Sequence, residues 1–156
     1  MGYNLSIGEG KMVKVDEDEW GDGYLNIEVV DVERPDAPAF GEPTDHSNER
    51  WPSYSSWANF AEQADLIPTL FQLDDNGNDT GNIRGGHPGH FLITEKFKKE
   101  VDEAMERYME RYPDATPNFD NYEAHPENGE LCRLVWLQYW TDWALNNCIN
   151  PIFKNT

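Results

Sequence analysis

The sequence is poor in basic residues and cysteine and has no long hydrophobic run. Its 156 residues include 12 Lys and Arg against 30 Asp and Glu, so the formal net charge is −18. Because such a charge repels phosphate, we expect no direct binding to DNA or RNA. No apolar run approaches the ~20 residues that cross a bilayer, and the N-terminal residues lack the basic and apolar regions of a secretory signal. We therefore expect no membrane association.

The two cysteines are too far apart to pair. Cys132 and Cys148 lie in one segment with the pattern of a helix, in which 16 residues span ~24 Å at ~1.5 Å per residue. A disulfide requires Cα atoms within ~7 Å. The sequence therefore predicts free thiols, which are typical of a cytoplasmic protein.

No complete catalytic or cofactor motif is present. Asp74, Asn76 and Asn78 alternate as in a calcium loop, but Asp79 occupies the position of the required glycine. The glycine-rich stretch 81–89 lacks the Gly-Lys-Ser/Thr ending of a phosphate-binding loop. These departures predict no bound cofactor and favour a non-enzymatic protein.

One histidine pair keeps an alternative open. His87 and His90 flank a Pro-Gly dipeptide, and imidazoles are common metal ligands and general bases. With Asp79 they form a candidate metal site, which corresponds to a small metal-binding domain or a hydrolase-like enzyme. An ordinary turn before a helix is the favoured interpretation of the same residues.

The N-terminal third has the pattern of short strands. Residues 3–7, 11–15 and 24–33 are rich in apolar and β-branched side chains, and residues 8–10 and 21–23 resemble turns. This pattern predicts a three-stranded antiparallel meander over residues 1–33.

The remainder of the chain predicts helices. After a proline-rich loop over 34–52, Ser53, Ser55 or Ser56 can cap a helix that ends near residue 64. Thr94 caps a second helix over 95–112, after a glycine-rich loop over 74–90. The last helix, over 128–149, is apolar around most of its circumference, which is typical of a central helix. We expect one α+β domain over 1–156, with a small antiparallel sheet packed on about three helices and the tryptophan-rich C-terminal helix at its centre.

Negative charge is concentrated near the N-terminus. Residues 1–50 contain 13 acidic and four basic side chains. The densest run surrounds one tryptophan, and an exposed tryptophan among carboxylates suits a basic protein groove. The predicted partner-binding residues are Asp16, Glu17, Asp18, Glu19, Trp20 and Asp22.

Several stretches resemble small acidic proteins of bacteriophages and prophages with no assigned activity: GYNLSIGE, WPSYSSWANF, the HPG turn and WLQYWTDWALNNC. The resemblance implies expression in the cytoplasm of an infected bacterial cell. It favours an interaction protein that inhibits a basic, nucleic-acid-handling host or defence protein in counter-defence, with DNA mimicry as one form. A virion accessory protein is the third interpretation.

Overall fold

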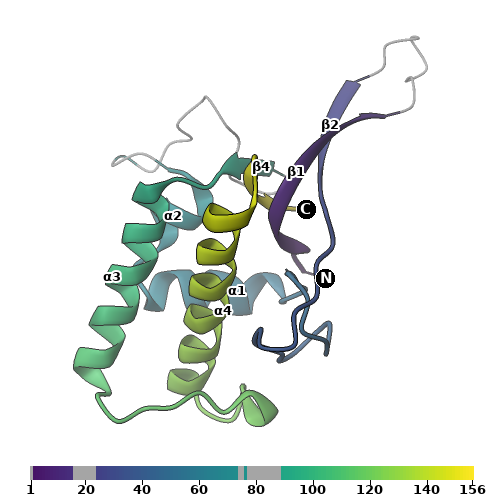
Figure 1. The fold of residues 1–156 in the computed structure, drawn as a ribbon. Coiled ribbons are helices and arrows are strands. Elements are labelled where there is room, and N and C mark those ends of the chain that lie inside the picture. Colours follow the sequence, from purple (N-terminus) through teal and green to yellow (C-terminus); the bar gives the residue numbers. More distant parts are fainter. Residues whose placement is uncertain (1, 16–23, 74–75, 77–88) are drawn as a thin grey trace.

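The computed structural model describes residues 2–15, 24–73, 76 and 89–156. Within these ranges the chain forms a five-stranded antiparallel sheet and four α-helices (Figure 1). The strands are β1 (Leu5–Val15), β2 (Tyr24–Val29), β3 (Glu49–Arg50), β4 (Gly89–Leu92) and β5 (Pro151–Asn155). The helices are α1 (Tyr54–Gln63), α2 (Ile67–Phe71), α3 (Glu95–Arg111) and α4 (Pro126–Asn147), with a short 3-10 helix, η1 (Phe119–Asn121). The predicted α+β class is confirmed.

The N-terminal segment is one long strand, not two. The turn predicted at residues 8–10 is wrong, because β1 continues through both glycines. A Cβ at Gly10 would lie 2.5 Å from Cγ1 of Ile152, and one at Gly8 would lie 2.9 Å from Nδ2 of Asn48. These glycines therefore allow close packing within the sheet.

The sheet is completed by the C-terminus. Its order is β2-β1-β5-β4, and β3 pairs with the start of β1. Leu5 lies opposite Asn155 in the β1–β5 ladder, and Phe91 lies opposite Phe153 in the β4–β5 ladder. The predicted three-stranded meander is therefore wrong, because β1 has β2 and the C-terminal strand as its main neighbours.

Helices α1, α3 and α4 and two of the predicted caps agree with the prediction, whereas α2 was not predicted. The Ser53 hydroxyl accepts a hydrogen bond from the Ser56 amide, and the Thr94 hydroxyl accepts one from the Phe97 amide. These bonds satisfy amides at the first turns of α1 and α3. Pro68 lies in the first turn of α2, where proline is tolerated.

Helix α4 is the centre of the core. It contacts α3, α1, β1 and β5, and Figure 1 shows it between α3 and the sheet. Leu134, Trp136, Leu137 and Trp140 are at most 1% exposed. Cys132 and Cys148 are both free thiols, as predicted. In the described chain no helix combines the length and apolarity needed to cross a membrane.

Candidate functional site

The predicted partner-binding residues, Asp16, Glu17, Asp18, Glu19, Trp20 and Asp22, lie outside the described residues. The structure does describe the strands that precede and follow them. The outer part of β1 pairs only with β2 there, and the ladder ends with Val15 opposite Tyr24. Figure 1 shows this two-stranded ribbon extending away from the helices.

The predicted histidine site is only partly described. Asp79 and His87 lie outside the described residues, whereas His90 is half-buried in β4, opposite Lys154. Among the described residues, no three or more His, Cys, Asp or Glu side chains are grouped so that they could hold a metal. The histidine pair stays a prediction.

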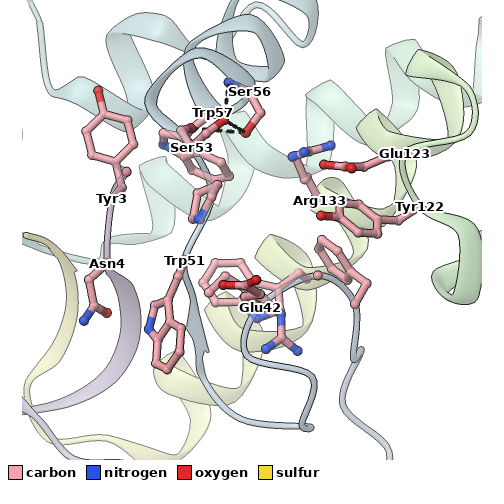
Figure 2. A pocket seen from close by; sticks show the side chains of 16 residues that line it. Tyr3, Asn4, Glu42, Trp51, Ser53, Ser56, Trp57, Tyr122, Glu123 and Arg133 are labelled. Carbon is pink, nitrogen blue, oxygen red and sulfur yellow. Dashed lines mark hydrogen bonds between the residues drawn. The ribbon is translucent and has the colours of Figure 1, made fainter.

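A cavity of about 610 Å³ lies between the N-terminal segment, the start of α1, η1 and α4. We call it the aromatic cavity; residues 2–4, 40–42, 50–53, 56–57, 122–123, 133 and 136 line it. Figure 2 shows Trp51 and Trp57 on one side and Tyr122 on another. Its volume falls within the range of small-molecule sites.

Arg50 builds one wall of the aromatic cavity. Its side chain is almost fully buried, and its Nη1 and Nη2 atoms donate to the carbonyl oxygens of Pro38, Pro43, Asp45 and Glu49 at 2.5–3.1 Å. The guanidinium also lies 5.3 Å from the centroid of the Phe40 ring. Burial lowers the pKa of Arg50 to about 10, so the group stays charged at neutral pH. This arginine therefore holds an irregular loop in place by its hydrogen bonds.

The opposite wall approaches that loop closely at Gly41. Gly41 has a φ of +66°, which favours glycine, and a Cβ there would lie 3.1 Å from the Tyr122 ring. Phe40 stacks on Phe119 with ring centroids 5.9 Å apart. The loop and η1 therefore close one side of the cavity with aromatic rings.

Arg133 is the second arginine of the aromatic cavity, and its donors are unused. Its guanidinium lies 5.7 Å from the centroid of the Tyr122 ring. Within the described chain it makes no hydrogen bond and no ion pair shorter than 4.0 Å. Figure 2 shows it pointing toward the space beside Ser56, with the Glu123 carboxylate nearby. Burial lowers the pKa of Arg133, while Tyr122 and Glu123 favour its charged form.

Two further donors in the lining of this cavity have no acceptor. Nε1 of Trp136 and Nε of Arg50 are buried without a hydrogen-bond partner among the described residues. Trp136 is 1% exposed and Arg50 is 4% exposed, so solvent reaches neither side chain freely. Buried donors are seldom left unpaired. The cavity therefore combines aromatic walls with unsatisfied donors.

In a second cavity, of about 570 Å³, no described lining residue has a buried side-chain polar atom without a hydrogen-bond partner. We call it the helical cavity, because α2, β4 and α3 line it. The Thr69 hydroxyl donates to Glu100 at 2.5 Å, and Nη2 of Arg107 donates to the carbonyl oxygen of Ala64 at 2.7 Å. Of the two cavities, the aromatic one is therefore the stronger candidate site.

Compared with family models, curated proteins and solved structures, the chain has no match. Its function is therefore inferred from its own residues. Arg50 and Arg133 were not among the residues predicted from the sequence. One signal was present, because Arg133 is the single basic residue in the 22 residues of α4, whose other side chains are largely apolar.

Proposed function

We propose that this protein is a non-enzymatic binding protein that engages and inhibits a basic, nucleic-acid-handling partner protein. The main observation in support of this proposal is the two-stranded ribbon of β1 and β2, whose described ends are Val15 and Tyr24. The eight residues that join those ends include five acidic side chains and no basic one. Two paired strands thus anchor both ends of the most acidic stretch of the chain.

The described surface supports the same proposal. Of the 30 acidic residues, eight lie outside the described ranges and 22 within them. Seven of the 22 lie within 4.0 Å of a described basic side chain. The negative field is therefore mostly uncompensated, which should steer a basic partner and make association sensitive to salt.

The first test is capture from bacterial lysate with the tagged protein at low and high salt, followed by mass spectrometry. We expect a nucleic-acid-binding or defence protein to be retained at low salt and depleted at high salt. Retention that is independent of salt would contradict an electrostatic contact.

Two matched variants locate the contact. D16N/E17Q/D18N/E19Q neutralises four of the five acids in the ribbon connection. E106Q/E110Q/D114N/D120N neutralises four exposed acids between the C-terminal part of α3 and η1. Each changes the net charge by the same amount. We expect the first variant to lose the partner and the second to retain it. Equal losses would show that overall charge, not the ribbon, causes capture.

The resemblance to phage proteins and the counter-defence role stay predictions. Isolation of the partner tests them directly, because an inhibitor should lower the activity of the captured protein in proportion to its occupancy. A captured protein whose activity is unchanged at saturation would contradict inhibition while leaving binding intact.

A further inference from the structure

The aromatic cavity contains an arginine, Arg133, that makes no hydrogen bond and no ion pair within the described chain. Acidic residues outnumber basic ones by 30 to 12, yet Arg133 makes no ion pair within the described chain. Its guanidinium is half-buried, so it has lost part of its hydration without gaining a protein acceptor. Such a group is stabilised by an acceptor that enters from outside.

Two neighbouring N–H groups also lack a hydrogen-bond acceptor. The side chains of Trp136 and Arg50 line the same cavity, and their Nε1 and Nε atoms are buried without acceptors within the described structure. A buried donor without a partner costs ~1–3 kcal/mol. This part of the lining therefore leaves two N–H groups without protein acceptors.

The shape of the donor favours a planar anion. A guanidinium offers a flat fork of N–H groups that matches the two oxygens of a carboxylate, or two oxygens of a phosphate. The acidic lining residues discriminate between these anions. Glu42 and Glu123 are exposed at the cavity, and they repel a doubly charged phosphate more than a singly charged carboxylate.

The walls favour a flat apolar body. Trp51, Trp57 and Tyr122 surround the space in Figure 2, and Trp51 is 47% exposed although its ring is large and apolar. Aromatic rings pack on one another in stacked or edge-to-face arrangements. An exposed tryptophan beside a cavity is therefore available to cover a bound ring.

We propose that the aromatic cavity binds a small aromatic carboxylate, with the carboxylate on Arg133 and the ring against the tryptophans. This inference does not depend on the proposed function, because it uses no residue of the acidic ribbon connection. It assigns Arg50 a supporting role, since its hydrogen bonds hold the loop that carries Phe40 and Glu42.

The test uses 2-naphthoate as the probe. Binding is followed by tryptophan fluorescence and by isothermal titration calorimetry on the full chain. Arg133→Gln should weaken binding roughly ten- to a hundredfold, the range for a hydrogen bond to a charged group. Arg34→Gln is the matched control, because it removes one exposed arginine outside the cavity. The control should bind as the unchanged protein does.

Two comparisons make the result decisive. Glu123→Gln removes an exposed carboxylate from the lining and should tighten binding of 2-naphthoate about two- to fivefold. The neutral analogue 2-naphthamide should bind at least tenfold more weakly than the acid. Equal binding of acid and amide, or unchanged binding by Arg133→Gln, would overturn the proposal. Inorganic phosphate that competes as well as 2-naphthoate would overturn the preference for a carboxylate.

Discussion

The aromatic cavity and the helical cavity are similar in volume but differ in how their polar side chains are used. In the helical cavity, Thr69 pairs with Glu100 and Arg107 binds the end of α1. In the aromatic cavity, Arg50 uses its Nη atoms to hold a loop, whereas the one contact of the Arg133 guanidinium within the described chain is with the Tyr122 ring. The volume of a cavity therefore does not by itself identify a candidate site. The presence of side-chain N–H groups without protein acceptors distinguishes the aromatic cavity from the helical cavity.

The largest effect is expected at Arg50. Arg50→Gln removes the donors of four backbone carbonyls. Since each buried unsatisfied group costs ~1–3 kcal/mol, we expect the free energy of unfolding to fall by about 3 kcal/mol or more. Urea denaturation measures this change, and Arg50→Lys should be intermediate because an ammonium cannot replace the fork. A loss below about 1 kcal/mol would show that the loop does not depend on this arginine.

A pH dependence of intermediate size is expected from Glu49, which precedes Arg50 on β3. Burial and the neighbouring carboxylates of Asp31 and Asp45 raise the pKa of Glu49 to about 7. The native state therefore holds this proton at pH values where the unfolded chain has released it. The stability it contributes is complete below about pH 4.5 and is lost as pH rises toward 7.

The full shift corresponds to about 2.5 kcal/mol between pH 5 and pH 8. Because Glu49 is only half-buried and solvent screens its neighbours, we expect the free energy of unfolding to fall by ~1–2 kcal/mol over this range. Urea denaturation of Glu49→Gln at both pH values should show a smaller fall. Glu28→Gln, which changes an exposed acid of β2, should keep the full dependence. Equal slopes for all three proteins would contradict the assignment to Glu49.

A smaller effect is expected in the helical cavity. Thr69→Val removes the hydroxyl that donates to Glu100 but preserves the shape of the side chain. Because Glu100 is partly exposed, water can replace the lost donor. We expect a loss of ~1 kcal/mol in the free energy of unfolding, measured by urea denaturation. A loss as large as that of Arg50→Gln would show that polar side chains contribute equally to stability in the two cavities.

The smallest effect is expected at Arg133. Because this guanidinium makes no hydrogen bond in the described chain, Arg133→Gln should change the free energy of unfolding by less than ~0.5 kcal/mol without ligand. Thermal and urea denaturation measure it. A loss above about 2 kcal/mol would show that Arg133 supports the fold, and the difference between the two arginines would then disappear.

The helices were predictable because their signals are local. Ser53 and Thr94 accept hydrogen bonds from amides three residues ahead, and Pro113 lies two residues after the end of α3. The apolar circumference of α4 predicted its central position, since a helix without a polar face must be covered on most sides. The continuity of β1 was not predictable in the same way, because the two glycines at positions 8 and 10 are typical of a turn. Their place in a strand is explained by the close approach of Asn48 to Gly8 and of Ile152 to Gly10, which the sequence does not show.

The aromatic cavity could not be found from local pattern. Its lining comes from segments as far apart as residues 2–4 and residues 133 and 136, and no motif joins them in the sequence. The loop before α1 was expected from its prolines, but its conformation depends on the buried side chains of Asn48 and Arg50. Their partners are backbone carbonyls and amides, which have no sequence signature.

The sequence by itself determined the α+β class, the caps and ends of the main helices, the free thiols and the strong negative charge. These features follow from neighbouring residues or from composition. Only the tertiary structure decided that β5 pairs with β1, that Arg50 donates hydrogen bonds to the loop before α1 and that Arg133 makes no hydrogen bond within the described chain. The reason is physical: strand pairing and the satisfaction of buried donors depend on groups that are distant in the chain and meet only after packing.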